Sequence, residues 1–321
     1  MASNHVVEAR GLSRDYIVHE GGLVRRTRRV VPALVDLDLV ITAGEAVGYL
    51  GANGSGKSTT IKMLSGILVP TRGSVRVLGH DPVPERRHLT RRIGVVFGQR
   101  SQLWWDLPLK ETYPILAAMH RLPGSVWRPR WDELVAGLEL EGFLDTPVRQ
   151  LSLGQRMRGE VAAALLHSPE LVILDEPTIG LDMISKENLR RHLDEERRTR
   201  GTTILLTTHD LGDVQRLCDR MVIIDHGKLA FDGTEAQLAE LTGARRMMTI
   251  DLDTPADGLV LPRGVELIDT EADGLRLNLR FERGVSAAQV LSAVQARAEV
   301  RDLSIEEPAI EDLVRHIYRR G

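Results

Sequence analysis

A chain of 321 residues, of which 42% are hydrophobic, is long enough for roughly two domains with buried cores. Its net charge of −3 argues against nonspecific binding to nucleic acid. No apolar run reaches the roughly 18 to 20 residues of a spanning helix, and the first residues lack an apolar signal core, so we expect a chain that spans no membrane. Its one cysteine, Cys218, cannot form an internal disulfide, which favours a reducing, cytosolic setting.

The first part of the chain leads into a glycine-rich loop. Residues 5–12 and 30–50 predict strands of an antiparallel layer, and a helix is predicted from residue 59 onward. Between strand and helix, residues 51–58 read G-A-N-G-S-G-K-S, which is the complete G-x-x-x-x-G-K-[ST] spacing. A glycine-rich turn that binds nothing is the alternative, but the flanking strand and helix are the context that the phosphate-binding loop requires.

This loop predicts binding of a nucleoside triphosphate with Mg²⁺. Glycines allow successive backbone N–H groups to turn inward around a phosphate. Lys57 would reach the β- and γ-phosphates, and Ser58 would hold Mg²⁺. The nucleotide-binding residues predicted here are Gly51, Asn53, Gly54, Ser55, Gly56, Lys57, Ser58 and Thr59.

Two later apolar strands are each followed by polar residues. Residues 171–174 read L-V-I-L, as in a strand buried on both faces, and are followed by Asp175 and Glu176. Asp175 suits a carboxylate near Mg²⁺, and Glu176 suits the base that orients the attacking water. Ordinary turn residues are the alternative for such a pair. Residues 203–206 form the second strand, which ends at T-T-H-D with His209.

The order and spacing of these segments resemble the nucleotide-binding subunit of ABC transporters. Besides the phosphate-binding loop and Asp175-Glu176, the resemblance rests on L-S-L-G-Q at 151–155 and on T-T-H-D at 207–210, and it covers roughly residues 5–235. It implies an α/β fold, the ABC-type P-loop NTPase, with a mixed sheet core, an antiparallel β layer and a helical subdomain at about 100–165. It also implies ATP and Mg²⁺ as ligands.

The resemblance assigns roles to further residues. Ser152, Gly154 and Gln155 look like the signature motif, which serves the ATP held by a second subunit in a head-to-tail dimer. His209 looks like the switch histidine that contacts the γ-phosphate and Glu176. Residues 179–182, I-G-L-D, look like the D-loop that crosses the dimer interface and contains Asp182. Tyr16 looks like the aromatic that stacks on adenine; half-buried packing is its alternative role.

The chain departs from the family pattern in two places. Leu153 stands in the signature motif where most relatives have glycine, so we expect binding to survive and turnover to be slow. After the predicted strand 93–97, Gly98 intervenes before the glutamine that senses Mg²⁺ and water. Gln99 is our choice for this catalytic and metal-binding glutamine, and Gln102 is the fallback.

Two tryptophans, Trp104 and Trp105, occupy the predicted loop that follows. In the family, a groove beside this loop receives a short cytoplasmic helix of the membrane subunit, and tryptophan is enriched among residues that dominate binding at interfaces. The alternative is that both rings fill the core of the helical subdomain. We expect one ring to pack inward and the other to line the groove.

The last 80 or so residues predict a small α+β C-terminal domain. Residues 246–253, 265–270, 274–281 and 300–305 read as strands, and residues 286–298 and 310–318 as helices. We therefore divide the chain into a nucleotide-binding domain at 1–240 and an accessory domain at 241–321, which resembles extensions on the ATPases of ABC-2-type exporters.

Three classes of function follow from the resemblance. The first is the ATPase of an ABC-2-type exporter, expected to be a homodimer bound to ABC-2-type membrane permease subunits at the cytoplasmic face of the cell membrane, with no nucleic acid partner. The second is the ATPase of an importer, for which no extension, or a longer all-β one, would be expected. The third is a non-transport ABC protein, but the long coiled coil of chromosomal members and the second ATPase domain of ribosomal members are missing.

Overall fold

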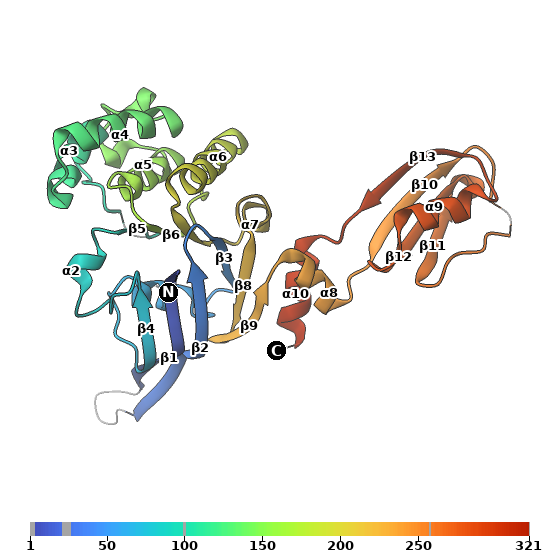
Figure 1. Ribbon diagram of the computed structural model, residues 1–321, viewed down its shortest axis with the longest axis horizontal. Helices are drawn as coiled ribbons and strands as arrows, with labels where there is room; N and C mark the ends of the chain where they lie inside the picture. Colours follow the sequence, from blue (N-terminus) through green and yellow to red (C-terminus); the bar gives the residue numbers. More distant parts are fainter. Residues whose placement is uncertain (1–3, 21–26, 99–100, 257, 321) are drawn as a thin grey trace. The chain divides into compact units, whose positions relative to one another are not determined.

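The computed structural model describes residues 4–20, 27–98, 101–256 and 258–320 (Figure 1). The chain divides into two compact units, Met1–Asp232 and Gly233–Gly321. The sequence placed the division near residue 240 instead. The difference arises because helix α8 (Glu235–Thr242) packs against α10 (Ile310–Arg320) within the second unit.

Two sheets build the first unit. An antiparallel sheet has the strand order β2-β1-β4, and a larger sheet has the order β5-β6-β7-β3-β8-β9. The strands of the antiparallel sheet are β1 (His5–Glu20), β2 (Thr27–Thr42) and β4 (Arg72–Val77). Those of the larger sheet are β3 (Ala46–Gly51), β5 (Ile93–Val96), β6 (Leu171–Asp175), β7 (Thr203–Thr207), β8 (Arg220–Asp225) and β9 (Lys228–Gly233).

The larger sheet brings three functional loops to one edge. Strands β6, β7 and β3 are neighbours in that order, and each pair is parallel. All residues of β7 and the first four of β6 are buried, as expected for strands covered on both faces. Parallel strands end on the same side, so the loops that follow β3, β6 and β7 meet there.

Helices cover the larger sheet and form the helical subdomain (Figure 1). The helices of this unit are α1 (Lys57–Leu64), α2 (Arg86–Leu89), α3 (Leu109–His120), α4 (Gly124–Gly137), α5 (Leu153–Leu165), α6 (Met183–Arg200) and α7 (Leu211–Leu217). Helix α3 is joined to α5 where the buried Tyr113 hydroxyl donates to the Gly159 carbonyl at 2.6 Å. Helix α4 is joined to α6 by the buried ion pair of Arg130 and Glu196 at 2.6 Å.

The second unit contains a four-stranded antiparallel sheet with the order β11-β12-β10-β13. Its strands are β10 (Arg246–Leu252), β11 (Val265–Glu271), β12 (Arg276–Phe281) and β13 (Val300–Glu306). Alternate residues of β10 and β12 form a core with Val290 and Val294 of α9 (Ala287–Gln295). These elements match the strands and helices predicted for this region, whereas α8 was not predicted.

None of the helices in the described part of the chain combines the length and apolarity that a membrane span requires.

Candidate active site

The loop between β3 and α1 has a backbone that only glycine permits at two positions. Gly54 and Gly56 have φ values of 83° and 108°. A Cβ on Gly56 would also lie 2.5 Å from the Ala33 carbonyl oxygen, and one on Gly51 would lie 2.2 Å from Ser55 Oγ. Side chains at Gly51 and Gly56 would force neighbouring atoms apart, whereas Gly54 is needed for its backbone conformation alone.

Several polar groups of this loop suit a bound phosphate. No described side chain caps the N-terminus of α1, so its first N–H groups remain for a ligand. Among the described residues, the buried Ser55 Oγ has no hydrogen-bond partner. The Lys57 Nζ atom donates to the carbonyl oxygens of Gly51 at 2.5 Å and Ala52 at 3.1 Å. A phosphate would replace these neutral acceptors with charged ones.

The loop and the end of β6 enclose one cavity of about 410 Å³. Burial lowers the pKa of Lys57, and the nearby charges of Glu176 and Asp175 act in the opposite direction. The cavity therefore places the Lys57 ammonium group near two carboxylates at the phosphate-binding loop. Its lining residues are Ala33, Asn53, Gly54, Gly56, Lys57, Ser58, Thr59, Lys62, Phe97, Gly98, Asp175, Glu176 and Ile179.

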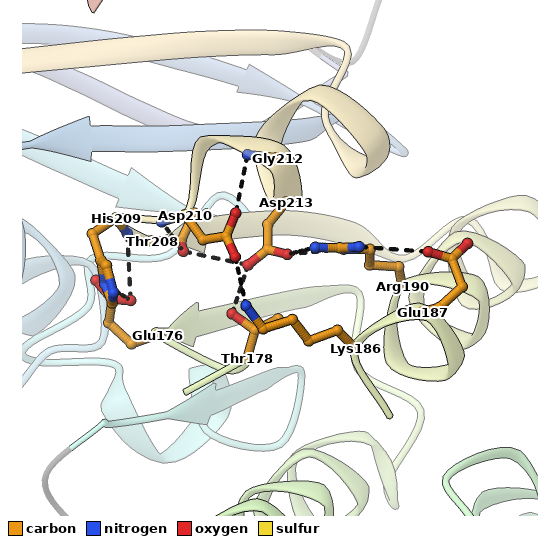
Figure 2. Close-up of polar contacts among 10 residues, drawn as sticks. All are labelled: Glu176, Thr178, Lys186, Glu187, Arg190, Thr208, His209, Asp210, Gly212 and Asp213. Carbon is orange, nitrogen blue, oxygen red and sulfur yellow. Dashed lines mark hydrogen bonds and ion pairs between the residues drawn. The ribbon is translucent and has the colours of Figure 1, made fainter. Parts of the chain in front are cut away.

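The two carboxylates at the end of β6 have different partners. Asp175 Oδ1 accepts a hydrogen bond from Thr207 Oγ1 at 2.5 Å, across the β6–β7 pair. Glu176 has a φ of 56°, in the left-handed region that non-glycine residues rarely adopt. Its Oε2 lies 2.7 Å from His209 Nδ1 and accepts from the His209 backbone N–H at 3.4 Å (Figure 2). The predicted base and the predicted switch histidine are therefore in direct contact.

Tyr16 of β1 lies next to the phosphate-binding loop. Its hydroxyl is 3.5 Å from Thr59 Oγ1, and the Arg14 guanidinium lies 5.1 Å from its ring centre. Tyr16 is only partly buried, so ring surface remains exposed to solvent.

The signature residues lie outside the residues that line this cavity. Ser152 caps α5: its Oγ accepts from the Gln155 N–H at 3.1 Å, and Gln155 Oε1 accepts from the Ser152 N–H at 2.9 Å. Asp182 caps α6 by accepting from the Ser185 N–H at 2.7 Å. Within one chain, the fold thus separates Ser152, Gly154, Gln155 and Asp182 from the phosphate-binding loop.

Gln99 lies outside the described residues. The fallback, Gln102, is held against α5: its side-chain amide donates to the Glu160 carbonyl and its backbone N–H to the Glu160 carboxylate, both at 3.1 Å. Burial raises the pKa of Glu160, and the hydrogen bonds from Ser101 and from the Gln102 backbone act in the opposite direction.

A polar cluster whose contacts the sequence did not predict lies beside Glu176 and His209 (Figure 2). It comprises Thr178, Lys186, Arg190, Thr208, Asp210 and Asp213. One signal was available, because Asp213 lies four residues before the apolar Leu217 and so shares its helix face, which the structure shows to be buried. An acid at a core position needs partners, which the sequence does not name.

Comparison with known proteins identifies the family. The ABC transporter family profile matches residues 34–179. The daunorubicin/doxorubicin resistance ATP-binding protein DrrA of Streptomyces peucetius is 36% identical over 88% of this chain and 86% of that protein. The ABC transporter ATP-binding protein NatA of Bacillus subtilis is 33% identical over 66% of this chain and 86% of that protein. A Nod factor export ATP-binding protein I of Burkholderia pseudomallei is 39% identical over 64% of this chain and 66% of that protein.

Solved structures agree with this assignment. The ATP-binding subunit of an ABC transporter superposes with a TM-score of 0.64 at 28% identity, over 74% of this chain and 93% of that one. The dimeric post-hydrolysis structure of the ATP-binding cassette MJ0796 with ADP and Pi gives 0.63 at 27% identity, over 71% and 98%. The fold and site thus define an ABC-type ATPase. The chain belongs to the ATP-binding proteins of the ABC transporter family, and the predicted family, fold class and ATPase activity are confirmed.

Proposed function

We propose that two copies of this chain bind ATP and Mg²⁺ head to tail and that hydrolysis powers an ABC-2-type membrane exporter. One observation carries the proposal. Lys57 and Glu176 line one cavity and His209 contacts Glu176, whereas the signature residues of the same chain lie outside the cavity lining. A second copy would supply the missing side of each site, and the similarity to a dimeric ABC cassette supports this arrangement.

The phosphate-binding loop binds the phosphates of ATP, and the end of β6 contributes to the Mg²⁺ site. The backbone N–H groups of the loop and the Lys57 ammonium group bind the phosphates. Ser58 and Asp175, together with Gln99, are the residues that would hold Mg²⁺. The metal would neutralise charge on the β- and γ-phosphate oxygens. The Tyr16 ring stacks on adenine, and its contact with Thr59 ties this platform to the loop.

Glu176 and His209 act on the attacking water. The Glu176 carboxylate orients the water and accepts its proton, and the His209 imidazole holds that carboxylate through Nδ1. From the other copy, Ser152, Gly154 and Gln155 at the N-terminus of α5 face the phosphate, where the helix dipole favours negative charge. Asp182 lies in the loop that faces the partner.

Export is supported by the names of two relatives, which refer to drug resistance and to Nod factor export. A groove of about 320 Å³, bordered by Phe97, Trp105, Arg156 and Glu160, suits a helix of a permease subunit. Trp104 and Trp105 are 36% and 52% exposed, so the expectation that one ring packs inward is wrong, whereas Trp105 lines the groove as expected. The chain would then sit at the cytoplasmic face of the membrane, bound through its permease.

The test is the Glu176→Gln variant, which keeps the shape of the side chain and removes the base. We expect unchanged ATP binding, turnover lower by roughly 10²-fold or more, and an ATP-dependent dimer in size-exclusion chromatography. Wild-type protein with ADP is the control and should remain monomeric. Hydrolysis at the normal rate by Glu176→Gln would refute the proposed role.

A further inference from the structure

A buried carboxylate lies behind the site. Asp213 of α7 is 1% exposed, and its Oδ2 accepts from Thr178 Oγ1 at 2.6 Å and from Thr208 Oγ1 at 3.4 Å (Figure 2). Both threonines are themselves buried. One carboxylate oxygen therefore joins two loops that are far apart in the sequence.

Helix α6 balances this charge. Arg190, whose side chain is 12% exposed, donates from Nε to Asp213 Oδ1 at 2.8 Å and also contacts it through Nη2. One turn earlier, Lys186 Nζ donates to Asp210 Oδ2 at 2.6 Å. Residues four apart share one face of a helix, so α6 presents two cations to the segment that follows His209. A buried acid without such a partner would be strongly destabilising.

The two threonines are adjacent to the reacting pair along the chain. Thr178 follows Glu176 by two residues, and Thr208 immediately precedes His209. Asp210, on the other side of His209, donates its backbone N–H to Thr208 Oγ1 at 3.0 Å. Glu176 also has the uncommon φ of 56°, which persists only when the surrounding structure holds it. Asp213 holds Thr178, two residues after Glu176 in the loop, and Thr208, next to His209, and so fixes both segments that form the Glu176–His209 contact.

We propose that Asp213 is a positioning residue for ATP hydrolysis, which holds the Thr178 and Thr208 loops together and thereby keeps Glu176 against His209. This inference rests on the roles proposed above for Glu176 and His209. A purely structural role for Asp213 predicts that its loss lowers stability and ATP binding together. A positioning role predicts a loss of turnover with ATP affinity preserved, because Asp213 does not line the nucleotide cavity.

The experiment uses the full chain and measures the ATP Kd and kcat for Thr178→Val, Asp213→Asn and the double variant. Valine matches the shape of threonine without the hydroxyl, and asparagine removes the charge. We expect kcat to fall by at least about tenfold in each single variant, since misplacing reacting groups costs this much or more. The Kd should stay within about twofold. The double variant should be no slower than the slower single variant, because both remove one interaction.

Two matched variants sharpen the test. Thr178→Ser keeps the hydroxyl and should recover turnover relative to Thr178→Val. Arg216→Gln removes the exposed Arg216–Glu187 ion pair of 3.0 Å at the outer end of the cluster and should leave kcat unchanged. If Asp213→Asn does not fold, the Thr178→Val and Thr178→Ser pair decides alone.

Several results would overturn the inference. These are a normal kcat in Thr178→Val, equal kcat values for the valine and serine variants, or a loss of ATP affinity as large as the loss of kcat. Glu176→Gln, measured in parallel, separates the two proposals. Normal hydrolysis by Glu176→Gln would refute the role of Glu176 itself. Impaired Glu176→Gln beside normal Thr178→Val would refute only the positioning by Asp213.

Discussion

The side chain of Leu153 lies against Gly180: a Cβ built on Gly180 would lie 2.8 Å from Leu153 Cγ. Gly180 has a φ of 75°, so the loop after Glu176 needs glycine there both for its backbone and for this contact. A Cβ on Gly154 would likewise lie 2.7 Å from the Gly180 carbonyl oxygen. The start of α5 and the D-loop, two segments proposed to face the partner copy, are thus packed together within one chain.

Replacing Leu153 with glycine tests the effect of this contact on turnover. Leu153 is 41% exposed, so its removal uncovers little core, and glycine at the start of a helix should cost no more than about 1 kcal/mol of unfolding free energy. We expect kcat at saturating ATP to rise, because the signature loop and the D-loop regain freedom to adjust to the nucleotide. Steady-state ATPase rates and thermal unfolding measure both effects. A lower kcat would show that the leucine contact assists the reaction.

Lys57→Ala should lower the affinity for ATP, whereas Glu176→Gln should impair activation of the attacking water. The Lys57 ammonium group lines the cavity and interacts electrostatically with Glu176 and Asp175, and its loss removes a charged contact with the phosphates. We expect the binding free energy to fall by at least about 2 kcal/mol. Nucleotide titration measures it, with Lys110→Ala on α3 as a control for removal of a surface lysine. Unchanged affinity in Lys57→Ala would mean that the loop does not hold phosphate.

The His167 imidazole predicts acid sensitivity of the first unit. Burial lowers the pKa of His167 to about 4, and the stacked His120, 4.0 Å away between ring centres, adds to the shift. Because the unfolded side chain titrates near 6.5, the unfolded state binds more protons below that pH. His167 therefore has no effect on the free energy of unfolding above pH 6.5. As the pH falls from 6.5 toward 4, its protonation in the unfolded state lowers the free energy of unfolding by up to about 3 kcal/mol.

Denaturant unfolding at pH 7 and pH 5 measures this loss. His167→Gln should reduce the difference between the unfolding free energies at the two pH values, because glutamine does not titrate and its amide can still donate to the Ile93 carbonyl that His167 Nε2 contacts at 3.0 Å. The exposed His88 of α2 provides the matched control, His88→Gln. An unchanged pH dependence in His167→Gln would refute the assignment.

A chain that ends at residue 234 should remain a folded nucleotide-binding protein. The core of the second unit is built from its own strands and α9, and every described residue proposed for chemistry lies in the first unit. We expect the ATP Kd to match that of the full chain while dimerisation or its regulation weakens. Nucleotide titration and light scattering measure the two properties. A folded truncated protein that does not bind ATP would place part of the site in the second unit.

The local chemistry of the phosphate-binding loop can be predicted from its residues alone. The spacing of residues 51–58 is contiguous, and its glycines set the backbone through short-range sterics, so the loop and its ligand class can be predicted without a fold. The alternation of apolar and polar residues in β10 and β12 likewise predicted strands, because successive side chains of a strand point to opposite faces of the sheet. Gln99 stays a prediction, since it lies outside the described residues.

The contacts between groups far apart in the sequence depend on the packing of the whole chain. The parallel register that pairs Asp175 with Thr207 brings the loops after β6 and β7 together, and with them Glu176 and His209. Thr178 and Asp213 are 35 residues apart, and nothing in their spacing identifies them as partners. The position of the unit boundary depended in the same way on the packing of α8 against α10. Contacts of this kind depend on strand order and helix packing, which arise from the whole chain, whereas a motif carries its geometry within a few residues.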